Sequence, residues 1–424
     1  MDLIIRNAKL TDHNSLVDIA IKEGIFQQIN ENIPFEAEKE IEAKGQFVIP
    51  PFVESHIHLD SALSVHHMPA NESGTLLEAI NLWDSFTDNL TKTDTYERAK
   101  KAVEWLVVQG VQHIRAHTDC TESSLQTMQA ILQLKEDMQS LVDIQVVAFP
   151  QNGLFLQDDA VELIEKAVQM GADVIGGLPQ AEITREDGIK QIAHIFDLAK
   201  KYNKTIDIHT DETTDDQSRF LEVIAKYTLQ YKMQNRVTAS HTTALHQYNN
   251  DYAAKVIQNV KRAGVHIVTN PFSNALLQNR LDGYPKSRGT TRVDELLANS
   301  VNVSIGNDNM MDPFGPLGKG NVLQAAHLLA HTAHLSSEQQ LNQLFQMITR
   351  NGAKTLQITD DYGIKVGNTA NCIILQATSI AEAIRLISDC LYVIRKGIII
   401  ATTEPAIRNL VTEQSTKQIH FTNT

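Results

Sequence analysis

The sequence predicts an α/β protein, a (β/α)8 barrel of the TIM type with a small β-sandwich domain formed from both termini. In the middle of the chain, eight short apolar runs alternate with longer stretches of helical period, which is the order of elements in such a barrel. Both ends carry a strand–glycine–strand pattern instead, KEGIF near the start and RKGIII near the end.

The terminal segments predict the sandwich. Asp2–Leu10 and Val17–Ile29 are strand-like runs broken at Asn and Gly, and Ala370–Leu375 and Leu391–Thr402 have the same character. Because an isolated hairpin is marginally stable in water, we expect the two ends to pair, and two independent hairpins are the alternative. The expected domains are residues 1–50 plus 366–424 for the sandwich and 51–365 for the barrel.

The middle of the chain predicts the barrel strands, each of which ends in polar residues. Glycines such as Gly110, Gly171 and Gly264 follow the helical stretches, as expected where helices stop. A doubly wound open sheet is the alternative, but it would normally carry a glycine-rich phosphate loop after its first strand, and none is present. The expected strands are Phe52–His58, Val111–Asp119, Ile144–Gln151, Ala172–Pro179, Thr205–Glu212, Arg236–His241, Val265–Asn270 and Val301–Asn309.

Composition narrows the class of function. The chain has 424 residues, with 37 Lys+Arg against 51 Asp+Glu and a net charge of −14, which argues against a nucleic-acid or anionic-membrane surface. Its three cysteines form no CxxC pattern, which argues against a disulfide framework and favours a reducing compartment. The start, MDLIIRNAKL, lacks the apolar core of a signal peptide, and no apolar run is long enough to span a bilayer. We therefore expect a cytoplasmic protein.

Polar residues at the strand ends predict a metal site, because the carboxyl ends of barrel strands meet on one face. His56 and His58 are two positions apart on a strand and point to the same side. His209 ends the fifth strand and Asp308 the eighth. Nitrogen and oxygen ligands of this kind suit Zn²⁺ or Fe²⁺. Because no lysine ends the fourth strand, ADVIGGLP, we expect a single ion.

Three further strand ends carry groups for chemistry. His241 is either a further ligand or, as we favour, a group that hydrogen-bonds the water to be activated. Glu212, three residues after His209, has the position of a proton shuttle, although a solvated acidic loop is the alternative. Gln151 follows the third strand, and its carboxamide can bind a ring amide, O=C–N–H. Spacing alone is equally compatible with an ordinary loop glutamine.

Several other histidines remain. His327, His331 and His334 lie at helical spacing but lack the Glu of a HExxH motif, so we expect them on one face of a barrel helix. His117 lies at the end of the second strand and stays an open candidate for the site.

Longer stretches of the chain closely resemble the amidohydrolase superfamily, and within it the bacterial cytosine deaminases. They include PPFVESHIHLD, DIQVVAFPQ, RVTASHTTALHQYN and YPKSRGTTRV, and the similarity runs from DLIIRNAKL to GIIIATTEPA. The resemblance implies a barrel with a flanking sandwich and one Fe²⁺ or Zn²⁺ ion. It implies that the ion is held by the four groups His56, His58, His209 and Asp308.

The same resemblance implies an activity, the metal-dependent hydrolytic deamination of a free nucleobase, with cytosine to uracil plus ammonia as the expected reaction of pyrimidine salvage. It implies that His241 positions the water, that Glu212 shuttles protons and that Gln151 holds the pyrimidine amide edge. Asp308 also takes part in proton transfer. The remaining substrate-binding residues implied are Phe149, Leu76, Phe314 and Asn309. A small heterocyclic base and water are the expected partners, with a homo-oligomeric assembly.

Two features depart from the cytosine deaminase pattern. The segment usually reading GHDD is GNDN, so Asn307 replaces a His and Asn309 an Asp, and Phe314 replaces a Trp. A pocket wall with one charge fewer and another shape leaves a related ring open as the substrate, such as isocytosine, a triazine or creatinine. Related branches that act on triazines carry Asn beside the metal-binding Asp. A non-catalytic scaffold is a more distant alternative, because such proteins typically lose the metal ligands.

Overall fold

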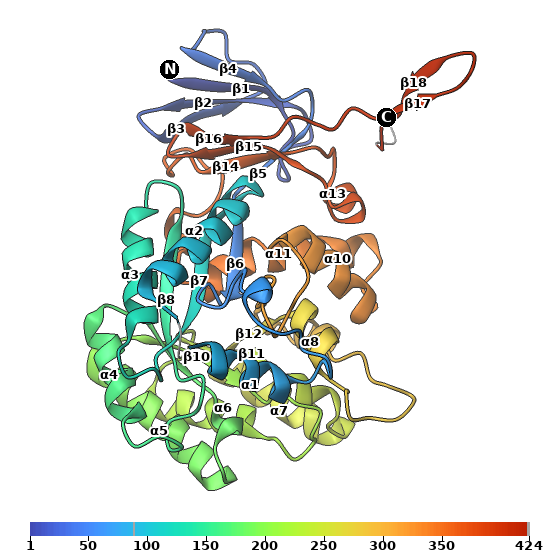
Figure 1. Ribbon diagram of the computed structural model, residues 1–424. Helices are drawn as coiled ribbons and strands as arrows, with labels where there is room; N and C mark the ends of the chain where they lie inside the picture. Colours follow the sequence, from blue (N-terminus) through green and yellow to red (C-terminus); the bar gives the residue numbers. More distant parts are fainter. Residues whose placement is uncertain (88–89, 422–424) are drawn as a thin grey trace.

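The computed structural model describes residues 1–87 and 90–421. A barrel surrounded by helices forms the body, and two antiparallel sheets lie across one end of it (Figure 1). The predicted fold class is therefore confirmed. The last three residues of the expected C-terminal segment, 422–424, lie outside the described residues.

The barrel consists of eight parallel strands that pair in chain order from β6 to β13. An isolated parallel bridge between Ile57 and Asp308 joins the two edges. The first and last strand ends are therefore neighbours, as barrel closure requires. The strands are β6 (Phe52–Ile57), β7 (Val111–Asp119), β8 (Asp143–Phe149), β9 (Val174–Gly177), β10 (Thr205–Thr210), β11 (Val237–His241), β12 (His266–Thr269) and β13 (Val303–Ile305).

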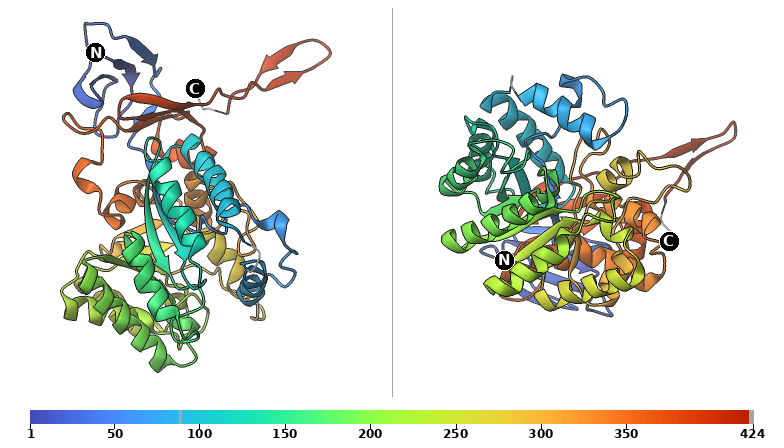
Figure 2. Two further views of the ribbon diagram at one scale, coloured as in Figure 1. Left: turned by 60° about the vertical axis from the view of Figure 1, so that its left-hand side comes forward. Right: turned by 90° about the horizontal axis from the view of Figure 1, so that it is seen from below.

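Helices surround this sheet (Figure 2), and α7 shows why they form. Ala253, Val256, Ile257 and Val260 recur every three or four residues and are all buried, and the helix ends at Gly264 with a φ of 61°. The helices of the body are α1 (Leu76–Thr87), α2 (Lys92–Val108), α3 (Gln126–Asp137), α4 (Ala160–Met170), α5 (Arg185–Tyr202), α6 (Phe220–Tyr231), α7 (Asn250–Ala263), α8 (Pro271–Leu277), α9 (Val293–Ala298), α10 (Val322–Thr332), α11 (Glu338–Met347) and α12 (Arg350–Thr355).

The sandwich is built from the two ends of the chain. One sheet has the order β3-β2-β1-β4 and the other β16-β15-β14-β5. Their inner faces share a core that includes Ile5, Ile19, Ile374 and Ile394. The strands are β1 (Leu3–Ala8), β2 (Val17–Lys22), β3 (Ile25–Asn30), β4 (Lys39–Glu42), β5 (Phe47–Ile49), β14 (Cys372–Leu375), β15 (Cys390–Arg395) and β16 (Ile398–Thr402), with α13 (Ile380–Leu386) between β14 and β15.

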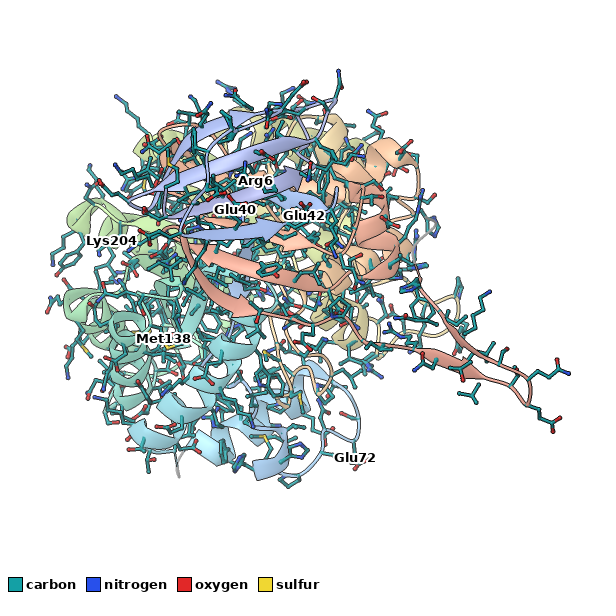
Figure 3. The ribbon with its side chains drawn as sticks, turned by 90° about the horizontal axis from the view of Figure 1, so that it is seen from above. Arg6, Glu40, Glu42, Glu72, Met138 and Lys204 are labelled. Atoms are coloured by element: carbon teal, nitrogen blue, oxygen red, sulfur yellow. The ribbon has the colours of Figure 1, made fainter. Side chains whose placement is uncertain are left out.

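The outer face of the N-terminal sheet is polar. Arg6 lies beside Glu40 there (Figure 3), and its guanidinium also donates to Asp18 at 2.9 Å. Beyond β16, the chain forms a hairpin of β17 (Asn409–Val411) and β18 (Thr416–Gln418), whose strand residues are all exposed. It projects away from both layers (Figures 1 and 2).

The barrel strands end earlier than the sequence predicts. Gln151, Glu212 and Asp308 all lie in the loops that follow β8, β10 and β13. The chain leaves the ladder because local backbone turns intervene. His241 has a φ of 70° and Asp308 a φ of 67°, conformations that cost a non-glycine residue about 1–3 kcal/mol and are typical of functional sites.

No helix among the described residues is both long and apolar enough to cross a membrane.

Candidate active site

Four of the predicted groups converge at the carboxyl ends of the barrel strands. Asp308 Oδ1 lies 3.2 Å from His56 Nε2 and 3.4 Å from His58 Nε2. The Nε2 atoms of His58 and His209 are 3.1 Å apart. All four side chains are buried. His241 also belongs to this cluster, since donor atoms of His56, His209, His241 and Asp308 all lie within 4.8 Å of one another.

The cluster fits a divalent metal ion. The buried His56 Nε2 has no hydrogen-bond partner among the described residues, and the facing nitrogens of His58 and His209 can form at most one hydrogen bond to each other. Three imidazoles and one carboxylate are the ligands that Zn²⁺ and Fe²⁺ accept. An ion between these atoms would satisfy the lone pairs that the protein leaves unpaired.

A chain of hydrogen bonds orients His56. Its Nδ1 lies 2.9 Å from Ser240 Oγ, and Ser240 donates its own proton to Asp207 at 2.7 Å. The other oxygen of Asp207 pairs with Arg115 at 2.9 Å. Because Ser240 donates to Asp207, its oxygen accepts from His56 Nδ1–H. The Nε2 lone pair of His56 therefore faces the cluster, as outer partners of metal-binding histidines usually arrange.

Replacing Ser240 with Ala is expected to weaken metal binding by about 10–100-fold, the usual cost of losing such an outer partner. Metal content measured by mass spectrometry against a competing chelator tests this. Ser304→Ala is the matched control, because Ser304 is also a buried serine on a barrel strand but bonds to Thr355. Equal metal affinity in the two variants would show that Ser240 does not orient His56.

His241 is held by residues that follow β12. Asn274 Nδ2 lies 2.9 Å from His241 Nδ1 and donates to it. Burial lowers the pKa of His241 to about 3, so the ring is neutral and carries its hydrogen on Nε2. His241 therefore offers a hydrogen-bond donor, which is what a group that positions a water requires.

Glu212 lies against His241, with 3.4 Å between Oε1 and Nδ1. Its side chain is buried in the protein, and burial, assisted by the charge of Asp308, raises the pKa of the carboxyl group well above its ordinary value. A carboxyl group in this state is protonated near neutral pH and can act as an acid.

The pocket beside the cluster contains the other predicted residues. Within the described residues, no protein group hydrogen-bonds the Gln151 carboxamide, so it is free to bind a ligand. Leu76, Ile80 and Trp83 present one face of α1 to the pocket. The residues that line it are His58, Asp60, Ser61, Leu76, Ile80, Trp83, Phe149, Gln151, Leu178, His209, Glu212, Leu277, Asp308, Asn309 and Phe314.

The two asparagines of GNDN have different surroundings. Asn309 lines the pocket, but its Oδ1 accepts from Ser273 at 2.6 Å and its Nδ2 donates to Asp312 at 3.0 Å. Asn307 bonds to the buried Glu54 at 2.5 Å and does not line the pocket. Of these two departures from the cytosine deaminase pattern, only Asn309 changes the pocket wall, which is neutral at this point.

His117 stacks on the ring of His56, with 3.8 Å between the ring centroids. It is fully buried, and burial lowers its pKa well below the ordinary value, so the ring is neutral. It supports the plane of His56 from the barrel interior.

Comparisons with known proteins agree with this geometry. The sequence profile of the amidohydrolase family matches residues 39–401. The chain belongs to the amidohydrolase family. This amidohydrolase is 39% identical to 5-methylcytosine deaminase from Klebsiella pneumoniae, solved with 5-fluorocytosine, with a TM-score of 0.92 over 95% of this chain and 98% of that one.

Two curated relatives have other substrates in their names. N-isopropylammelide isopropyl amidohydrolase of Pseudomonas sp. (strain ADP) is 30% identical over 413 residues, which cover 95% of this chain and 98% of the relative. Pterin deaminase of Rhizobium rhizogenes is 28% identical over 405 residues, covering 93% and 90%. Together these similarities support a hydrolase that acts on C–N bonds and deaminates a heterocycle, and they confirm the predicted resemblance.

Several residues of this amidohydrolase site were not predicted. Ser240 directly precedes His241, and its burial in the barrel was the available signal. Asn274 lies in NPFSN, directly after a predicted strand, so its position at the carboxyl end of the barrel was accessible. Trp83 and Ile80 gave no signal, because only the folding of α1 over the strand ends brings them to the pocket.

Proposed function

We propose that this amidohydrolase deaminates free cytosine-type pyrimidines, converting cytosine to uracil and 5-methylcytosine to thymine, each with water consumed and ammonia released. One observation carries the proposal. A single pocket combines the unpaired carboxamide of Gln151, the buried acid Glu212 and the His/Asp cluster with an apolar wall. The similarity to 5-methylcytosine deaminase over nearly the whole chain supports the same class of ring.

In this proposal, His56, His58, His209 and Asp308 hold one Fe²⁺ or Zn²⁺ ion. Such an ion would supply Lewis-acid chemistry and lower the pKa of a water molecule. Fe²⁺ and Zn²⁺ both accept imidazole and carboxylate ligands, so the donor set supports either metal.

The protein's own residues would move the protons. Glu212, protonated because of its raised pKa, would give its proton to the ring nitrogen beside the carbon that carries the amine. That protonation eases addition of water to an aromatic ring. Glu212 would then pass a proton from the water to the amine, which leaves as ammonia. His241 would orient the water through Nε2–H, and Gln151 would pair with the O=C–N–H edge.

The apolar wall supports a ring with a substituent. Leu76, Phe149 and Phe314 line the pocket together with the neutral Asn309, whose amide is already hydrogen-bonded to the protein. Burying one methyl group against such a wall contributes about 0.8 kcal/mol. We therefore expect 5-methylcytosine to be processed at least as well as cytosine.

Ammonia release from a panel of rings tests the proposal. The panel contains cytosine, 5-methylcytosine, isocytosine, creatinine and pterin, with Fe²⁺ or Zn²⁺ supplied. The two cytosines should give the highest kcat/KM, and 5-methylcytosine should lose its advantage over cytosine when Phe314 is changed to Trp. Preference for any other ring on the panel would refute the proposal.

Hydrolysis of an N-alkylated triazine is the second candidate. It is favoured by the 30% identity to N-isopropylammelide isopropyl amidohydrolase, since an apolar wall also suits an isopropyl group. Release of isopropylamine from N-isopropylammelide, followed by chromatography beside the ring panel, distinguishes the two.

A further inference from the structure

Away from the active site, two histidines on α10 face each other. His327 and His331 are one helical turn apart and therefore lie on the same side of the helix. Their Nε2 atoms are 3.3 Å apart, and their ring centroids are 5.0 Å apart. His327 is half-buried and His331 is exposed.

A contact with a second helix fixes the form of His327. Its Nδ1 lies 3.0 Å from the carbonyl oxygen of Ile384 on α13. A carbonyl only accepts, so Nδ1 carries the ring hydrogen, and Nε2 turns its lone pair toward His331. Figure 1 shows α13 close to α10, and this hydrogen bond has the form of the outer contact that orients metal-binding histidines.

The spacing of the two nitrogens matches a shared ion. Two imidazoles on one tetrahedral ion, each with a metal–nitrogen bond of about 2.0–2.1 Å, hold their nitrogens about 3.3–3.4 Å apart. The free rings can instead share one N–H···N hydrogen bond, in which His331 is the donor. An ion would replace that hydrogen by using the second lone pair.

The position on the helix also favours a cation. Both histidines lie in the second half of α10 (Val322–Thr332), and His331 is in its last turn. The negative end of the helix dipole stabilises positive charge there, and the chain as a whole carries a net charge of −14. Among the described residues, no third His, Cys, Asp or Glu completes a compact group with this pair, so water would fill the remaining positions.

We propose that His327 and His331 form a peripheral site for one divalent transition-metal ion of the Cu²⁺, Ni²⁺ or Zn²⁺ class. It differs from the active-site cluster in its donors, two imidazoles rather than imidazoles with a carboxylate, and in its access to solvent. By the usual order of stabilities, Cu²⁺ binds it most tightly of the three. The site bridges α10 and α13 through the Ile384 carbonyl, and it does not depend on the proposed function.

A metal titration tests this site. The full-length protein is first loaded with Zn²⁺, so that the buried cluster is occupied, and is then titrated with Cu²⁺ and followed by calorimetry and electron paramagnetic resonance. The wild type should bind one additional Cu²⁺ ion with a spectrum of two nitrogen ligands. His331→Gln should weaken this binding at least tenfold and remove the two-nitrogen signal.

His334→Gln is the matched control, because His334 is exposed and lies just beyond α10. It should bind the additional Cu²⁺ like the wild type, and the melting temperature of each variant before titration checks that it is folded. The proposal is overturned if His331→Gln binds the additional ion as tightly as the wild type. It is equally overturned if the wild type binds no additional ion.

Discussion

Replacing Glu212 with Gln is expected to lower kcat for ring deamination by about 10²–10⁴-fold, the range over which a positioned acid or base contributes to catalysis. Glutamine keeps the size of the side chain but cannot release a proton. The burial that raises the pKa of Glu212 makes the carboxyl group an acid at neutral pH, and the amide has no such form. Steady-state ammonia release gives kcat, and metal analysis shows whether the ion is retained.

The control for this change is Asp216→Asn. Asp216 is an exposed carboxylate four residues further along the same loop, so the substitution removes a charge without touching the pocket. It should leave kcat within about twofold of the wild type, since surface substitutions rarely matter. Near wild-type turnover in Glu212→Gln with the metal bound would mean that another group moves the proton.

Replacing Asp308 with Asn is expected to cost both the metal and the activity. Asp308 supplies the carboxylate of the cluster, at 3.2 Å from His56 Nε2, and an amide is a far weaker ligand for a divalent ion. The loss of metal affinity should exceed the about 10–100-fold that follows from removing an outer partner. Mass spectrometry of the purified protein and ammonia release after incubation with excess Fe²⁺ or Zn²⁺ measure the two effects.

Asp312→Asn is the matched control for Asp308→Asn. Asp312 is a fully buried carboxylate four residues later, where it accepts hydrogen bonds from Ser61 and from the backbone of Gly315. This variant should keep its metal even if the loop is less stable. If Asp308→Asn retains the ion as well as Asp312→Asn does, Asp308 is not a ligand.

Much of the site follows from local rules. The two-residue repeat of a strand places His56 and His58 side by side, and the parallel order of the strands brings His209 and Asp308 to the same end. These inferences need only the chain direction and the strand period. The exact strand ends were less accessible, because local turns such as those at His241 and Asp308 remove residues from the ladder.

Other parts of the site depend on contacts between distant segments. Asn307 and Asn309 flank the same residue, yet one is paired with Glu54 and the other lines the pocket. Sequence position does not distinguish them, because the difference arises where β6 packs beside the end of β13. Trp83 is a similar case, since its place in the pocket depends on the packing of α1 against Leu277 and Phe314.

The pairing of β5 with β14 also has a consequence for biosynthesis. Phe47 pairs with Leu375, so the beginning of the chain must wait for residues that leave the ribosome more than three hundred positions later. Pairings that are so distant form slowly, because a long loop has to close first. During translation, the barrel can assemble while the early strands still lack their partners, and the nascent chain carries an open apolar sheet face until its last segment emerges.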